Sequence, residues 1–443
     1  MQSVSEKIRS SIKRINVDHR RIARGMLLVS AFVLIGKIAG AVKDASIAYR
    51  YGIGEVVDLY SLALVYTLWA PIVIGGTLGS VCIPLIHKLN LEEKIEFRNQ
   101  LFGLTLIISG LVAIILAYLL PGLLEDYFNA ETVGVGASLN FVTYSFAPIA
   151  SLSILSALFS MMLLSDEHHA NTIFDAIPSL ILLILVLAWP NAEDIDALLW
   201  GSIIGFILQT VGLFILVNKR IGKMRPRLGF SSRGWKMLKK GFSIVILGQF
   251  ILSWVDPISF HIAENLGEGN VSSLNYASKI ILLFMALGAM ATSRAILPVF
   301  SNTERKMNQR LRLAIQWSTF SFVGGLAATV VVFLLAPEIV RTIYERGAFD
   351  STDTTNIAIG VKLGALQFPF YFSGVVQAQF FLSLGYYRLI LQGALLAFLA
   401  KLFFTLLLAP SMGYSGIMLA TVPMYMATNI LFTSRIIRMS KNT

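Results

Sequence analysis

Long apolar stretches separated by short polar connections are the main pattern along this chain. Twelve of these stretches are long enough to cross the hydrocarbon core of a membrane as helices. They lie near residues 26–49, 59–86, 101–121, 138–163, 172–189, 197–217, 241–262, 274–300, 313–336, 356–383, 388–409 and 414–434. The pattern predicts an all-α polytopic membrane protein of about twelve transmembrane helices, with no separate soluble domain between them.

Basic and acidic connections alternate along the chain. Lysine and arginine are concentrated in residues 1–25 and 218–240, after the eighth stretch and at the C-terminus, whereas the alternate connections carry acids such as Glu125, Glu193 and Glu264. Basic connections of membrane proteins stay in the cytoplasm, so both termini are expected there. This topology accounts for the net charge of +11. Membrane lipids are therefore expected partners of the basic segments, and nucleic acid is not.

Composition agrees with a membrane protein and gives no sign of catalysis. Charged residues make up 14% of the chain, whereas soluble domains carry about 25%. Cys82 is the only cysteine, which excludes disulfides and thiolate metal clusters. The sequence has no phosphate-binding G-x-x-x-x-G-K-[ST] loop, no H-E-x-x-H and no G-x-S-x-G. We therefore expect no enzyme, no catalytic residue, no metal site and no cofactor, beyond a possible role for a coupling cation or the membrane potential.

The two halves of the chain resemble each other. YGIGEVVDLYSLA follows the first apolar stretch and LGEGNVSSLNYAS follows the seventh, so that Gly52 and Gly54 align with Gly267 and Gly269. Six spans per half give both halves the same orientation in the membrane, as in a parallel repeat. We predict two six-helix lobes, residues 26–217 and 241–437, joined by the basic connection 218–240 and preceded by the basic segment 1–25. The four aligned glycines are expected in loops at the gate between the lobes.

Charged residues inside the apolar stretches are the candidate functional residues. Lys37, Lys43 and Asp44 lie in the first stretch, and Lys279 and Arg294 lie in the eighth. A charge at membrane depth costs a few kcal/mol, so it usually serves a pathway or a partner. We predict that the four cations line one shared cavity that binds an anionic substrate. The alternative is that these charges only neutralise one another between packed helices.

Acids in the spans form a second candidate group. Asp44, Asp58 and Asp256 are assigned, together with Lys401, to the cavity or to ion coupling. Asp256 and Lys401 are isolated opposite charges, so either they pair in one access state or Asp256 binds a coupling cation. A third interpretation is that Asp256 only caps a helix break beside Pro257. Lys362 is expected either in the cavity or at a lipid headgroup.

Several ordered motifs resemble one family of membrane proteins. The stretch GKIAGAVKDASIAYRYGIGEVVDLYSLA, the segment VSSLNYASK, the ILP near Pro298 and IYERGAFDSTDT at residues 343–354 are similar to the lipid II flippases of the mouse-virulence-factor family. FFLSLGYYR and GYSGIMLAT continue the likeness, which covers about residues 26–437. That family belongs to the multidrug/oligosaccharidyl-lipid/polysaccharide exporter superfamily.

The resemblance implies two lobes around a cationic cavity that opens alternately to each side of the bacterial cytoplasmic membrane. The implied substrate is an undecaprenyl-pyrophosphate-linked saccharide, with envelope-synthesis enzymes as possible partners. Lys37, Lys43 and Lys279 replace arginines usual in the family, and lysine keeps the charge without the bidentate fork of arginine. Residues 68–79 lack the family's usual arginine, Arg294 is an addition, and two C-terminal helices of the family are expected to be absent.

Three functional hypotheses follow. The favoured one is a flippase for lipid II or a related envelope polysaccharide precursor. The alternatives are a cation-coupled small-molecule or multidrug antiporter of the same superfamily, and a non-transporting scaffold of an envelope-synthesis complex. An acidic cavity would be more natural for an exporter of cationic drugs, so the lysines favour the flippase.

Overall fold

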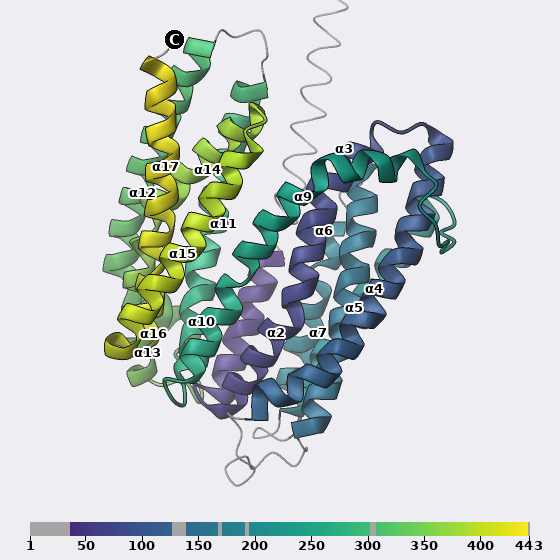
Figure 1. The fold of residues 1–443 in the computed structure, drawn as a ribbon. Coiled ribbons are helices and arrows are strands. Elements are labelled where there is room, and N and C mark those ends of the chain that lie inside the picture. The colour runs from purple at the N-terminus through teal and green to yellow at the C-terminus, as the bar shows by residue number, and fades with distance from the viewer. Residues whose placement is uncertain (1–35, 126–138, 167–170, 191–194, 302–306, 442–443) are drawn as a thin grey trace, which may run out of the picture.

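A computed structural model describes residues 36–125, 139–166, 171–190, 195–301 and 307–441, and these residues form helices and connections without strands (Figure 1). The predicted N-terminal segment 1–25 lies outside the described residues. The first helix is described over residues 36–51. The helices of the first half that follow it are α2 (Glu55–Thr77), the π-helix η1 (Leu78–Cys82), α3 (Ile83–Ile86), α4 (Leu91–Glu125), α5 (Leu139–Ser165), α6 (Asn171–Phe174), α7 (Ile177–Ala188) and α8 (Asp196–Arg220). The second half contains α9 (Arg233–Ser253), α10 (Val255–Glu264), α11 (Asn270–Ser301), α12 (Met307–Tyr344), α13 (Ser351–Ala365), α14 (Phe368–Ser383), α15 (Tyr387–Met412), α16 (Tyr414–Leu419) and α17 (Thr421–Lys441).

Most of these helices are long and apolar enough to cross a membrane. Nine qualify within the described residues, and ten if α13 and α14, which meet at a 41° bend, are counted as one span. The first helix, described only from residue 36, and the shorter α7 do not qualify. The predicted all-α membrane fold is therefore confirmed, but the number of twelve spans is not.

The helices form two groups that share a core at one end of the molecule. One cluster of buried side chains joins the groups through residues such as Leu62, Phe146, Tyr276 and Phe368. Toward the other end the core divides into a cluster around Phe97 in the first group and a separate one around α12, α14 and α17 in the second. Figure 1 shows the two groups diverging toward the end that carries the C-terminus.

We call the first helix to α8 the N-lobe and α10–α17 the C-lobe. Helix α9 packs against α15 of the C-lobe and also contacts α2, η1, α3 and α4 of the N-lobe. The lobe boundaries near residues 217 and 241 remain predictions. The end at which the lobes diverge carries the basic connection 218–240 and is called the basic end; the opposite end, with Gly52–Gly54 and Gly267–Gly269, is called the glycine end.

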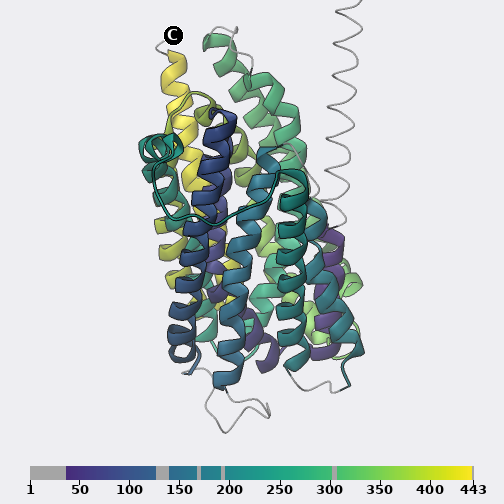
Figure 2. The same cartoon turned by 90° about the vertical axis from the view of Figure 1, so that its right-hand side faces the viewer.

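The basic connection is fastened along α4. Asn99 of α4 accepts a hydrogen bond from the Arg225 amide through its side chain and one from the Arg227 amide through its carbonyl, each 3.1 Å long. The Trp235 indole N–H donates to Gln100 Oε1 over 2.8 Å. Figure 2 shows this extended segment crossing the outer face of the N-lobe helices. These contacts hold the start of α9, and so the link between the lobes, on the N-lobe.

Gly325 and Gly324 provide a matched test of the packing between α12 and α14. A Cβ atom at Gly325 would lie 2.6 Å from Pro369 Cα and 2.7 Å from Phe368 O, whereas one at Gly324 would have no atom within 4 Å. We expect Gly325→Ala to destabilise the protein by about 1–3 kcal/mol, because the backbone of α14 cannot yield as a side chain would. Thermal unfolding of the purified protein in detergent measures this, with Gly324→Ala as the control. Equal melting temperatures for both variants would contradict the packing.

Candidate substrate-binding site

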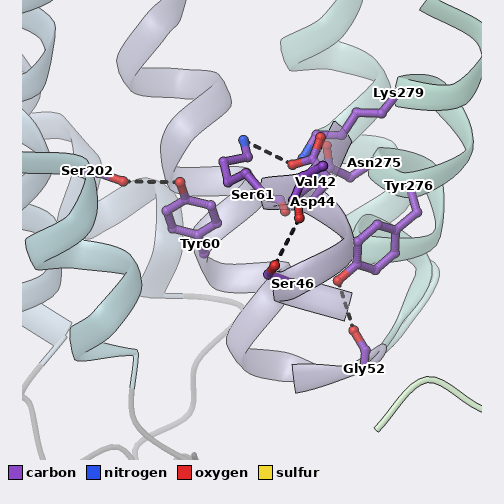
Figure 3. A network of polar contacts seen from close by, with 11 residues as sticks. Val42, Asp44, Ser46, Gly52, Tyr60, Ser61, Ser202, Asn275, Tyr276 and Lys279 are labelled. Carbon is purple, nitrogen blue, oxygen red and sulfur yellow. Dashed lines mark hydrogen bonds and ion pairs between the residues drawn. The ribbon is translucent and has the colours of Figure 1, made fainter. Parts of the chain in front are cut away.

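One face of α11 contacts the N-lobe over successive turns. Ser272 and Lys279 are seven residues apart, two helical turns, and Asn275 and Tyr276 lie between them on the same side. Figure 3 shows Asn275, Tyr276 and Lys279 directed toward the first helix and α2. This face of α11 supplies polar contacts from the glycine end inward, and we describe them in that order.

The outermost contact binds Asp58 of α2 to the beginning of α11. Its Oδ2 accepts a hydrogen bond from the Gly269 amide at 2.7 Å and its Oδ1 accepts one from the Ser272 amide at 2.6 Å. The first amides of a helix have no partner within the helix and lie at the positive end of its dipole. A carboxylate satisfies both requirements, which explains how Asp58 can be 0% exposed.

This position corrects the sequence-based assignment of Asp58. The sequence pattern assigns the carboxylate to the cavity or to ion coupling, whereas in the structure both of its oxygens accept hydrogen bonds from backbone amides inside the lobe interface. These partners of Asp58 could not be predicted from sequence. The amides lie more than 200 residues away, and every residue except proline has a backbone amide, so no residue type marks them. Asp58 fastens the two lobes together at the glycine end.

Two further contacts lie one turn along α11. The Asn275 side-chain amide donates to Ser61 Oγ at 2.7 Å, and the buried Tyr276 hydroxyl donates to the Gly52 carbonyl at 3.1 Å. Both bonds join the N-lobe to the C-lobe, and Figure 3 shows the one between Tyr276 and Gly52. The glycine end is thus closed by specific polar contacts as well as by the shared apolar core.

An ion pair between the lobes lies one turn further in. Lys279 Nζ is 2.6 Å from Asp44 Oδ1, and Lys43 Nζ is 3.0 Å from the same oxygen. The Asp44 side chain is 9% exposed and the Lys279 side chain 27%, so the lysine retains access to solvent where the acid does not. One carboxylate oxygen therefore holds two ammonium groups, one from each lobe.

A cavity of about 270 Å³ opens beside this ion pair. Lys37, Asp44 and Lys279 line it together with Gly36 and Gly40. A Cβ atom at either glycine would have no neighbour within 4 Å, so the absent side chains leave the lysines accessible from this side. The cavity also touches α7 and the end of α12, which makes its walls partly apolar.

Three of the four predicted cations come together here. Lys37 and Lys279 line the cavity, and Lys43 shares Asp44 with Lys279. Arg294 falls in α11, but its side chain lies outside the described residues. With three lysines against one aspartate, the group keeps a net charge of +2, so Asp44 cannot neutralise it. The arrangement suits an anion that would complete the neutralisation.

Asp256 lies at a second cavity between the lobes, of about 280 Å³, lined by residues of α2, α9 and α10. Its carboxylate forms no ion pair with Lys401, because their charged atoms are more than 4.0 Å apart. The ammonium of Lys401, a residue 4% exposed, donates instead to the Ile417 carbonyl at 2.5 Å. Helix α9 ends at Ser253 and α10 begins at Val255, so Asp256 does lie in the first turn after a helix break. The pairing of Asp256 with Lys401 in another access state stays a prediction.

Three of the four predicted gate glycines, Gly52, Gly54 and Gly269, lie at the lobe interface of the glycine end, whereas a Cβ at Gly267 would have no neighbour within 4 Å. Gly52, Gly267 and Gly269 have φ values of 62°, 101° and 80°, a region that favours glycine. A Cβ at Gly269 would lie 3.0 Å from the Ile53 side chain, and one at Gly54 would lie 3.7 Å from Glu268 Oε1. The loops of the two halves therefore contact each other, as the internal repeat predicted. Their action as a gate stays a prediction.

Arg50 is a structural residue that the sequence analysis missed. Its guanidinium donates to the carbonyls of Val186 and Trp189, the second at 2.6 Å. These carbonyls lie at the end of α7, where helical acceptors have no partner within the helix. No sequence motif could indicate the pairing, since both acceptors are backbone atoms.

The ammonium of Lys362 lies 5.6 Å from the centroid of the Phe333 ring, and Lys362 does not line the lysine cavity.

Two lobes of apolar helices with a cavity between them are the architecture of a membrane transport protein. The lipid II flippase MurJ family model matches residues 47–442. The chain therefore belongs to the lipid II flippase MurJ family, and it is a multi-pass membrane protein.

Individual relatives show the extent of the similarity. The chain is 26% identical over 425 residues to the probable lipid II flippase MurJ of Rickettsia prowazekii, covering 90% of this chain and 80% of that protein. It is 23% identical over 372 residues to the probable lipid II flippase MurJ of Rhizobium meliloti, covering 78% of this chain and 68% of that protein. These alignments extend across both halves of the chain.

Solved structures agree on the fold. A lipid II flippase MurJ in an inward closed conformation superposes with a TM-score of 0.76 at 21% identity, covering 94% of this chain and 90% of that one. An inward-facing multidrug resistance MATE family transporter of the MOP superfamily superposes with a TM-score of 0.69 at 13% identity, covering 94% of this chain and 99% of that one. At these identities the likeness concerns the fold alone, which the flippase and the transporter share.

The contact between the glycine loops can be tested by crosslinking. We expect a Gly54→Cys/Glu268→Cys pair, introduced after Cys82→Ala, to be joined efficiently by a short thiol-specific crosslinker, because Gly54 lies beside the Glu268 side chain. The crosslinked protein should be held closed at the glycine end and lose transport in proteoliposomes, and reduction of a cleavable crosslinker should restore it. Transport at the normal rate in the crosslinked protein would show that these loops are not the gate.

The separation of Asp256 from Lys401 leads to a second test. If the two charges pair only in another access state, Asp256→Asn should impair transport and Asp256→Asn/Lys401→Met should recover much of it, because no buried charge is left without a partner. If Asp256 instead binds a coupling cation, the double variant should stay inactive. Transport rates in proteoliposomes distinguish the two outcomes, and full activity of Asp256→Asn would remove both.

Proposed function

We propose that this protein flips an undecaprenyl-pyrophosphate-linked saccharide, lipid II or a closely related envelope precursor, across the bacterial cytoplasmic membrane. Membership of the lipid II flippase MurJ family supports this substrate. The observation that carries the proposal in this chain is the excess of lysine over aspartate at the lobe interface. A pyrophosphate supplies the negative charge that the group lacks.

The substrate would enter by exchange of ionic partners. In the structure, Asp44 of the N-lobe forms an ion pair with Lys279 of the C-lobe. A pyrophosphate in the cavity competes with Asp44 for the Lys279 ammonium. When the pyrophosphate binds Lys279, Asp44 keeps its ion pair with Lys43, its neighbour in the same helix. Because the exchange replaces a contact between lobes by a contact with substrate, binding weakens the attachment of α11 to the N-lobe.

The basic end is proposed to face the cytoplasm, with both termini on that side. The excess of lysine and arginine in residues 218–240 and at the C-terminus supports this orientation, because basic connections usually stay in the cytoplasm. The glycine end then faces outward, and the contacts of Asp58, Asn275 and Tyr276 keep it closed. Alternating access requires these contacts to break after the substrate has bound from the cytoplasmic side.

A cation-coupled antiporter is the second candidate, and it has less support. The MATE transporters that share the fold are 13–15% identical to this chain. The charge at the main cavity argues against a cationic substrate, since Asp44 is already bound by two lysines.

Enzymes of envelope synthesis are natural partners of a flippase, because they make and consume its substrate, and we propose an interaction with them.

The charge requirement gives a direct prediction. Lys43→Ala and Lys279→Ala should each lower the initial rate of lipid II flipping in proteoliposomes by about tenfold or more, equivalent to ~1.4 kcal/mol. Lys43→Arg and Lys279→Arg should retain activity, because positive charge is the property required. Lys362→Ala is the control, since Lys362 contacts Phe333 and not the cavity. Loss of activity in the arginine variants, or equal loss in the control, would contradict the proposal.

A further inference from the structure

A third cavity lies within the N-lobe and shares no residue with the lysine cavity. It has a volume of about 370 Å³ and is lined from α2 and η1, from α5, from α8 and from the α6–α7 region. Its polar lining consists of hydroxyls, two amides and one carboxylate: Ser153, Ser156, Ser160, Asn171, Asp175 and Gln209. Oxygen atoms therefore line it, and none of its lining residues in the described part of the chain is a lysine or an arginine.

Within the described residues, the side-chain oxygen of Asn171 lacks a hydrogen-bond partner. The residue is 6% exposed, and its Oδ1 forms no hydrogen bond within the described part of the chain. A buried carbonyl oxygen without a partner costs free energy, so such atoms usually bind water or an ion. Asn171 is one of the residues that line the cavity, so its side chain lies beside any occupant.

Asp175 places a negative charge in the same cavity at membrane depth. Its Oδ1 accepts a hydrogen bond from the Gln209 side-chain amide at 3.1 Å. Gln209 lies ten residues before Lys219 in α8, a rise of about 15 Å from the basic end. Among the described residues, Asp175 has no lysine, arginine or histidine nitrogen within 4.0 Å. The Asp175 side chain is exposed to the cavity, so a cation that enters the cavity can reach its carboxylate.

The local backbone is suited to ion binding. Helix α6 ends at Phe174 and α7 begins at Ile177, so Asp175 lies in the break between two helices. Broken helices inside transporters commonly form ion sites, because their free ends and polar side chains replace water around the ion. On the facing helix α5, Ser153, Ser156 and Ser160 follow a spacing of three and four residues and so share one face.

We propose that Asp175, Asn171 and the α5 serines bind a monovalent metal cation, with Na⁺ as the first candidate. Carboxylate, amide carbonyl and hydroxyl oxygens are ligands for hard cations. A single carboxylate balances one positive charge, whereas a divalent ion would leave an excess charge inside the membrane. The site lies in the N-lobe, separate from both Asp256 and Lys401.

Binding of the cation does not depend on the proposed function, but its use as a coupling ion would rest on it. A cation that ties α5 to the α6–α7 break stabilises one arrangement of the N-lobe helices. Substrate and cation then act on the same lobe at different places, the substrate at Lys37 and Lys43 and the cation at Asp175. This separation allows cation binding to be measured without any substrate.

The test uses the purified full-length protein in detergent, in N-methyl-D-glucamine chloride at constant ionic strength. Replacement of N-methyl-D-glucamine by Na⁺ should raise the thermal unfolding midpoint in a saturable way, because a ligand of the native state stabilises it by mass action. Binding of ²²Na⁺ should saturate at one ion per chain. Asp175→Asn should abolish both effects, and Asn171→Ala should weaken the apparent affinity by about tenfold or more. Li⁺ and K⁺ titrations give the selectivity.

Asp196→Asn is the matched control, because it removes an acid from the other end of α8, away from the cavity. It should keep the Na⁺ response. Absence of a saturable response to Na⁺, Li⁺ or K⁺ in the unsubstituted protein would overturn the proposal, and so would an unchanged response in Asp175→Asn together with Asn171→Ala. A protein that binds Na⁺ but flips no lipid would leave the cation site intact and refute only the proposed function.

Discussion

The ion pair between Asp44 and Lys279 is the interaction on which the arrangement of the two lobes depends most directly. It joins the first helix to α11 at 2.6 Å, at the point where the closed glycine end gives way to the cavity. Removal of both charges from water costs several kcal/mol, so the pair adds little to stability when taken alone. Its value lies in its reversibility. An anion can take the place of Asp44, and Lys43 can keep Asp44 paired when that happens.

Helix α11 connects this exchange to the closure of the glycine end. Asp58 binds the amides at its beginning, Asn275 and Tyr276 bind the N-lobe one turn later, and Lys279 reaches Asp44 after another turn. Helices transmit displacement because they are rigid over a few turns. A change of partner at Lys279 therefore acts on the same body that Asp58 holds. The sodium site proposed at Asp175 would act at the break between α6 and α7, four residues from Ser179 at the lysine cavity.

The parts of the structure that depend on hydrophobic pattern and on charge were predictable from sequence. Lys37 and Asp44 share a face because seven residues are two helical turns, and the structure places both at one cavity. The meeting of the two glycine loops followed from the internal repeat. The partners of Asp58 and Arg50 could not be predicted, since each binds backbone atoms more than 100 residues away. The choice of Asp44 as the partner of Lys279 also depends on how the lobes pack, which no local pattern specifies.

The central claim is that Lys279 exchanges Asp44 for the pyrophosphate of the substrate. It is tested most directly by the affinity of the purified protein for lipid II compared with a neutral analogue that lacks both phosphates. We expect the unsubstituted protein to prefer lipid II, Asp44→Asn to strengthen the preference by removing the competitor, and Lys279→Gln largely to abolish it. An equal preference for lipid II in all three proteins would show that Lys279 does not exchange Asp44 for pyrophosphate.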